Sequence, residues 1–162
     1  MRRNAITFSR RHKIWLYGIT LLAFLSGIAW AWLHYWMQRM GEFGDEANPA
    51  ELWMLKTHGA AAMGMLVMLG TLLPLHVKFG WHARRNRGSG AAMLAFFGLL
   101  TITGYGLYYI GAEHLRAWTS WIHLGLGLVL PVFLGVHIWL GKKTSRISAA
   151  QAVRLLHKDK PS

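Results

Sequence analysis

Residues 116 to 141 form an apolar stretch long enough to cross a lipid bilayer as one helix, and this stretch contains two histidines. His123 and His137 are fourteen residues apart. At about 100° and about 1.5 Å per residue, this spacing places both on one helix face, about 21 Å apart along the axis. An ionisable side chain in hydrocarbon is costly and usually has a partner, so each histidine is expected to have one.

Two histidines in phase, one near each surface of the membrane, favour a role as ligands. Neutral imidazole binds transition metals and haem iron. The alternative is a structural pair, hydrogen-bonded to the backbone or to Ser and Thr hydroxyls. The chain has no cysteine, which excludes disulfides, thiolate-bound iron–sulfur clusters and covalent CxxCH haem attachment. Any haem must therefore be held non-covalently, through histidines.

The composition is typical of a membrane protein with basic loops. Of the 162 residues, 54% are hydrophobic, yet the formal net charge is +12. The basic residues flank apolar runs instead of forming one stripe, which disfavours nucleic acid binding. We predict an all-α integral membrane four-helix bundle that makes a single domain over residues 1–162. The expected spans are about 14–37, 52–79, 90–111 and 117–141, followed by a short interfacial tail helix at 147–157.

Lysine and arginine predict the orientation of these spans. The N-terminal head, the second loop and the tail contain 5, 4 and 6 of them, whereas the opposite side has only Arg39, Lys56 and Arg116. Both termini are therefore expected in the cytoplasm. The head shows no small-residue cleavage site before the first apolar run, so we expect the first span to be retained. Pro74 is expected to kink the second span near its end.

With this orientation, the second and fourth spans run in the same direction. His58 and His123 then lie near the outer surface and can face each other, while His137 lies near the inner surface. Two residues could partner His137. His76 is 18 residues beyond His58, five whole turns and about 27 Å, which is about 6 Å more than the spacing of the fourth-span pair. His12 opens the first span, at the interface, so the geometry leaves the choice open.

Four motifs in the chain resemble those of one known family. They are IHLGLGLVLPVFLGVHIW at 122–139, the Thr-Gly pair at 103–104, LSG at 25–27 and LKTH at 55–58. They are similar to the four-helix, di-haem cytochrome b subunits that accompany respiratory formate dehydrogenases and nickel-iron hydrogenases, and to their stand-alone bacterial relatives. In that family, two histidines fourteen residues apart on the fourth helix each bind one haem.

The resemblance implies two b-type haems and a ligand set. The outer haem would be bound by His58 and His123, and the inner haem by His12 and His137. The family's first ligand usually directly precedes a tryptophan, whereas here two residues separate His12 from Trp15. His76 therefore stays an alternative inner ligand.

The function that follows is transmembrane electron transfer, with electrons exchanged with a quinone and a redox partner protein or larger oxidoreductase complex. The resemblance also implies a multi-pass protein of the bacterial inner membrane. No nucleophile, general-base pair or phosphate loop is recognisable, so any catalysis would be limited to quinone oxidoreduction. His34, also on the outer side, is expected to have an interfacial role.

Two alternatives belong to other classes of protein. One is a haem-free membrane assembly or interaction subunit whose histidines are structural. The other is a proton or metal-ion transporter that uses the row of histidines. Such pathways usually include intramembrane carboxylates, and the expected spans contain none between their ends, which disfavours the transporter.

Overall fold

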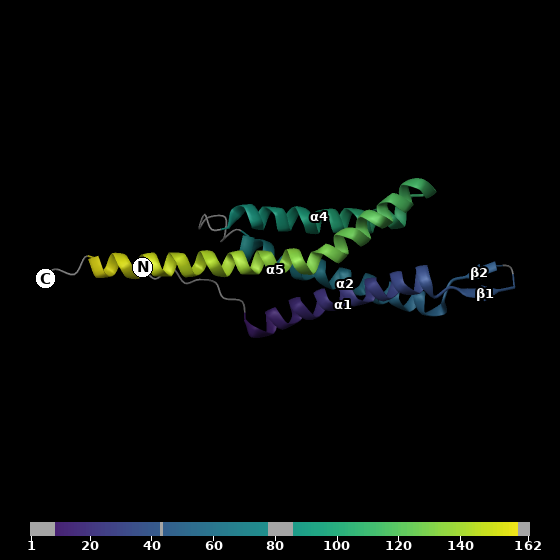
Figure 1. Ribbon diagram of the computed structural model, residues 1–162, viewed down its shortest axis with the longest axis horizontal. Coiled ribbons are helices and arrows are strands. Elements are labelled where there is room, and N and C mark those ends of the chain that lie inside the picture. The colour runs from purple at the N-terminus through teal and green to yellow at the C-terminus, as the bar shows by residue number, and fades with distance from the viewer. Residues whose placement is uncertain (1–8, 43, 78–85, 159–162) are drawn as a thin grey trace. The chain divides into compact units, whose positions relative to one another are not determined.

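The computed structural model describes residues 9–42, 44–77 and 86–158, with side chains at all of these positions except 75, 76 and 145–158. The chain divides into two compact units, 1–76 and 77–162. Each unit is a helical hairpin (Figure 1). The first contains α1 (Arg10–Trp36), β1 (Arg39–Gly41), β2 (Gly44–Glu46) and α2 (Pro49–Leu72), which a π-helical segment, η1 (Leu73–Val77), follows. The second contains α4 (Arg87–Tyr109) and α5 (Glu113–Lys158).

Four helices in the described residues are long and apolar enough to cross a membrane, which confirms the four expected spans as helices. They are Arg10–Trp36, Pro49–Leu72, Arg87–Tyr109 and the segment Glu113–Thr144 of α5. The helices begin three or four residues before the expected spans. The end of the second expected span and three of the four basic residues of the second loop, Lys78, Arg84 and Arg85, lie outside the described residues.

The early start of α1 follows from its capping residue. Ser9 is the N-cap, and its side chain accepts a hydrogen bond from the backbone N–H of His12 at 3.2 Å. Such a cap satisfies one of the free N–H groups of the first turn and contributes about 1 kcal/mol. His12 therefore lies inside the first turn of α1, with a fixed backbone.

The start of α2 is capped from both directions. The Asn48 side chain accepts from the backbone N–H of Ala50 at 3.0 Å, and the Glu51 carboxylate accepts from the backbone N–H of Asn48 at 3.2 Å. Pro49 occupies the first helical turn, where it needs no donor. At the other end, α-helical structure stops at Leu72 and the π-helical segment η1 contains Pro74. Pro74 thus lies where the helix type changes, and the kink expected at this proline stays a prediction.

A short β-hairpin connects α1 to α2, where the sequence predicted only a loop. β1 and β2 are antiparallel, with Arg39 opposite Glu46 and Gly41 opposite Gly44. Gly44 has a φ of 121°, which a residue with a side chain rarely adopts. In Figure 1 the two strands project beyond the ends of α1 and α2. The hairpin adds two short strands to a chain that is otherwise helical in its described residues, so the all-α prediction is confirmed.

The fourth helix differs from its prediction by its length. α5 is one helix of 46 residues, and residues 147–157 continue it without a break. Pro131 lies inside the helix, and Figure 1 shows that α5 bends along its length. A proline removes one backbone hydrogen bond and crowds the carbonyl four residues earlier, here that of Gly127.

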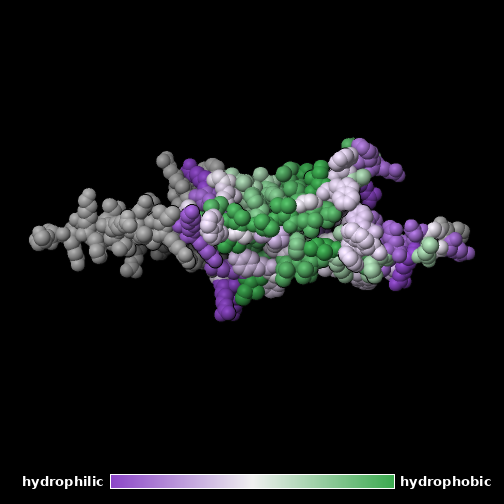
Figure 2. Space-filling model, in the orientation of Figure 1, coloured by the Kyte–Doolittle hydropathy of each residue, from purple (hydrophilic) through white to green (hydrophobic). Residues whose placement is uncertain are grey.

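The described residues bury little hydrophobic surface. Ala31, Ala61, Met65, Met93 and Leu130 are buried, whereas Val67, Ile102 and Val132 are each 69% exposed. In Figure 2 hydrophobic residues cover the middle of the helices and hydrophilic ones gather toward their ends. Exposure of such a continuous apolar surface to water is unfavourable, whereas the hydrocarbon core of a lipid bilayer can accommodate it.

Candidate functional site

His58 lies between α2 and α1, half-buried in the first hairpin. Its Nδ1 is 2.8 Å from the backbone carbonyl oxygen of Ala23 and 3.4 Å from Oγ of Ser26. A carbonyl oxygen can only accept, so Nδ1 must donate its proton. This assigns the neutral tautomer in which Nε2 has the lone pair, the form that binds a metal through Nε2.

Gly27 allows this close approach. A Cβ atom at Gly27 would lie 3.1 Å from Cε1 and 3.2 Å from Nδ1 of His58. Any other residue at this position would displace the imidazole ring of His58 from its present place. The LSG motif on α1 and the LKTH motif on α2 thus meet at one point of the first hairpin.

His123 has a corresponding environment in the second hairpin. Its Nδ1 lies 2.9 Å from Oγ1 of Thr103 on α4. Oγ1 of Thr103 also lies 2.7 Å from the carbonyl oxygen of Leu99, and a hydroxyl that donates to this carbonyl accepts from Nδ1–H of His123. A Cβ atom at Gly104 would lie 3.1 Å from Cε1 of His123. The tautomer is again the one with the lone pair on Nε2.

His137 contacts a third hydroxyl, one that sequence analysis missed. Oγ of Ser89 lies 2.7 Å from Nδ1 of His137. Ser89 and Thr103 are fourteen residues apart on α4, as are the two histidines on α5. When two antiparallel helices each have polar residues at the same spacing, one register brings both pairs into contact. The equal spacings could therefore have identified Ser89 from the sequence.

His12 lies on the same face of α1 as the contact with His58. Its Nε2 atom is buried. Ser26 follows His12 by fourteen residues, which is 40° short of four turns and about 21 Å along the axis. His76 lies in η1, and its side chain is outside the described residues.

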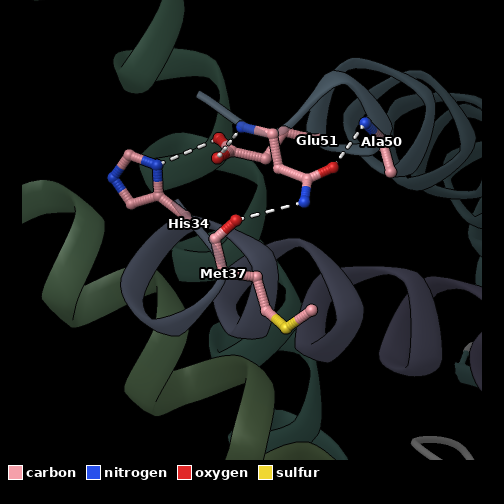
Figure 3. A network of polar contacts seen from close by, with 5 residues as sticks. His34, Met37, Ala50 and Glu51 are labelled. Atoms are coloured by element: carbon pink, nitrogen blue, oxygen red, sulfur yellow. Dashed lines mark hydrogen bonds and ion pairs between the residues drawn. The ribbon is translucent and has the colours of Figure 1, made fainter. Parts of the chain in front are cut away.

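His34 belongs to a separate polar network where α1 and α2 meet the β-hairpin (Figure 3). Its Nδ1 is 3.0 Å from Oε2 of Glu51, a buried carboxylate, and its ring stacks on Trp30. The side-chain amide of Asn48 donates to the carbonyl oxygen of Met37 at 3.1 Å. His34 therefore connects the ends of α1 and α2, and the interfacial role expected for it stays a prediction.

The structure brings His58, His123 and His137 each to a hydroxyl or carbonyl within its own hairpin. His58 and His123 belong to different compact units, so their pairing across one haem stays a prediction, as does the pairing of His137 with His12 or His76. Within the described residues no three His, Asp or Glu side chains converge on a common point. A bis-histidine haem needs only two, so this finding does not bear on it.

Comparison of the chain with protein-family models, with curated proteins and with solved structures found no match.

Proposed function

We propose that the protein is a membrane-embedded b-type cytochrome that holds two haems non-covalently and transfers electrons across the bilayer. The proposal combines the four apolar helices with the environment of their histidines. It includes a four-helix bundle with both termini in the cytoplasm and a bacterial inner membrane as its location, on the basis of the basic loops and the family resemblance.

The observation that supports the proposal most strongly is the matched register of α4 and α5. Thr103 lies against His123 and Ser89 against His137, two polar pairs about 21 Å apart along otherwise apolar helices. A histidine that binds a metal through Nε2 almost always donates its other N–H to an oxygen. His58 and His123 meet this condition through Ala23 and Thr103. These side chains therefore fit the requirements of haem ligands.

The depth of His12 in the first hairpin supports it as the inner ligand. His58 contacts α1 at Ala23 and Ser26, which lie 11 and 14 residues beyond His12, about 17 and 21 Å along the axis, and this is near the roughly 21 Å that separates His123 from His137. For His76 the corresponding distance is about 27 Å. We therefore keep His58 with His123 for the outer haem and His12 with His137 for the inner one, and retain His76 as the alternative.

Each haem, when bound, would supply a one-electron carrier. Two histidines of this chain would hold each haem, so that no coordination position would stay available to a substrate. The apolar helices would exclude water from the ligands, the Ala23 carbonyl would hold the proton on Nδ1 of His58, and Thr103 and Ser89 would orient the rings of His123 and His137. We propose a quinone and a redox partner protein as the sources and acceptors of electrons, from the family resemblance alone.

A second candidate function rests on the same contacts. A histidine with Nδ1 bonded to a neighbouring helix also serves as a structural polar link between membrane helices. The protein would then be a haem-free assembly or interaction subunit. This candidate gives no reason for the equal spacing of His12 to Ser26, Ser89 to Thr103 and His123 to His137, so we place it second.

The deciding experiment is a haem measurement on the full chain purified from membranes in detergent. We expect b-type absorption on reduction and two extractable haems per chain. A variant with His58, His123 and His137 all replaced by Ala, purified in the same way, is the matched control and should contain none. A folded, monodisperse wild-type protein without haem would overturn the proposal in favour of the haem-free subunit.

A further inference from the structure

Hydroxyl side chains on α4 contact His123 and His137 of α5, one at each level. Thr103 and Ser89 are both partly shielded from solvent, and both lie within hydrogen-bond distance of Nδ1, at 2.9 Å and 2.7 Å. The other threonine of α4 makes a different contact. Thr101 is exposed and donates only to the carbonyl oxygen of Phe97 at 2.8 Å.

We infer that Thr103 and Ser89 are positioning residues, each of which sets the ring orientation and the electron donation of one haem ligand. The inference rests on the proposed function. It assigns Thr103 to the haem bound by His123 and Ser89 to the haem bound by His137. The two hydroxyls would thus tune the two centres separately.

The physical reason is the direction of the hydrogen bond at His123. Oγ1 of Thr103 lies 2.7 Å from the carbonyl oxygen of Leu99 and 2.9 Å from Nδ1 of His123, and in the inferred arrangement the hydroxyl donates to Leu99 and accepts the Nδ1 proton. Withdrawing that proton from the ring makes Nε2 a stronger electron donor, which stabilises ferric over ferrous iron. The same bond limits rotation of the imidazole about its own side chain. Losing the acceptor should raise the reduction potential and loosen the ring.

The glycine that follows Thr103 makes the contact rigid. A Cβ atom at Gly104 would lie 3.1 Å from Cε1 of His123, so the ring is confined between this backbone and the hydroxyl. At Ser89 the arrangement is more open, since a Cβ atom on the following Gly90 would meet nothing within 4 Å. The ring of His137 is therefore held by Ser89 with less help from the backbone.

The test uses the haem-loaded full chain with Thr103→Val, which keeps the size of the side chain and removes the hydroxyl, and with Ser89→Ala. Thr101→Val is the matched control on α4. The readouts are the midpoint potential of each haem in a redox titration and the electron paramagnetic resonance signals of the oxidised protein, which report ring orientation. Apparent haem affinity is measured beside them.

We expect Thr103→Val to raise the potential of one haem and Ser89→Ala to raise that of the other. The affinity for the affected haem should fall roughly 10- to 100-fold, as is usual when the partner of a ligating histidine is lost. Thr103→Ser and Ser89→Thr should restore wild-type behaviour, because both keep the hydroxyl. Thr101→Val should change neither haem.

The outcomes separate the two proposals. Wild-type protein without haem would refute the proposed function itself. Wild-type protein with two haems, together with a Thr103→Val variant that matches Thr101→Val in potential and resonance signals, would refute only the positioning role. Shifts of the same haem by Thr103→Val and Ser89→Ala would also refute it. If Thr103→Val does not accumulate, Thr103→Ala is measured against Thr101→Ala by the same criteria.

Discussion

The Nδ1 contacts fix which nitrogen of each ring has the proton, and this determines what the histidines can do. In His58 a carbonyl oxygen at 2.8 Å forces the proton onto Nδ1, and in His123 a threonine hydroxyl that donates to Leu99 has the same effect in the arrangement we infer. Both rings therefore have the lone pair on Nε2. A histidine with the opposite tautomer would have to break this bond before it could bind iron through Nε2.

Replacing the proposed ligands one at a time should remove one haem at a time. We expect His58→Ala, His123→Ala and His137→Ala each to leave roughly half of the wild-type haem, because an axial ligand lost from a bis-histidine site leaves a five-coordinate or empty centre. His34→Ala is the control, since that side chain pairs with Glu51. Haem content per chain measures the effect. Full haem content in all three variants would contradict the ligand assignment.

The inner ligand is decided by comparing His12→Ala with His76→Ala. The axial spacing of about 21 Å along α1 matches that of the α5 pair, so we expect His12→Ala to lose the same haem as His137→Ala. His76→Ala should keep both haems. The reduced spectrum and the potentials of the remaining centre identify which haem is lost. If His76→Ala loses the inner haem and His12→Ala does not, both haems are bound between α2 and α5.

At the scale of the elements, the junction of α1 and α2 depends on Glu51. This buried carboxylate caps α2 through the backbone N–H of Asn48 and pairs with His34 on α1. Glu51→Ala removes both contacts, whereas Glu51→Gln can keep the cap and loses the negative charge. We expect Glu51→Ala to lower the free energy of unfolding by roughly 1–2 kcal/mol and Glu51→Gln by less.

Unfolding of the detergent-solubilised protein, followed by circular dichroism, measures this difference. Glu42→Ala is the matched control, because Glu42 is an exposed carboxylate of the β1–β2 connection. If Glu51→Ala and Glu42→Ala are equally stable, the contacts of Glu51 with Asn48 and His34 contribute nothing to the free energy of unfolding. A loss in Glu51→Gln as large as in Glu51→Ala would assign the effect to the ion pair with His34 instead of the cap.

The helices were predictable because runs of apolar residues are long, and their ends were missed because apolar content does not mark a cap. Asn48, Pro49 and Glu51 are a capping sequence that would have placed the start of α2 correctly. Two strands of three residues are too short for any periodic pattern, so β1 and β2 could not be predicted in this way. The continuation of α5 through residues 147–157 was missed because the apolar run stops near residue 141, whereas the helix does not.

The histidines of the candidate site could be predicted from the sequence, but most of their partners could not. His58, His123 and His137 stand out because they are polar in apolar spans. Ser89 does not, because a serine near a helix start is usually a cap or a surface residue. Its role becomes visible only when the register of α4 on α5 puts it against His137.

At the scale of the whole molecule, the pairing of the two hairpins across the outer haem can be tested without replacing a ligand. If His58 and His123 share one haem, Ser26→Ala should affect the same haem as Thr103→Val. The shift should be smaller, because the Ala23 carbonyl at 2.8 Å still accepts from Nδ1 of His58 when the Ser26 hydroxyl at 3.4 Å is gone. Redox titration of both variants measures it. A shift of the haem that responds to Ser89→Ala would mean that the hairpins pair differently.

The distribution of charge predicts the orientation of the molecule in the membrane. Fifteen of the 18 lysines and arginines lie in the head, the second loop and the tail, and basic loops are retained on the cytoplasmic side. Reporter fusions at Ser162 and within residues 41–48 should therefore place the tail in the cytoplasm and the β-hairpin outside. Fusions to a variant with Lys142 and Lys143 replaced by Gln control for the tail's own charge, and the head and second loop should still keep the tail inside. A tail on the outside of the wild-type protein would exchange the outer and inner haem, while the contacts within each hairpin would be unchanged, because they depend only on helix register.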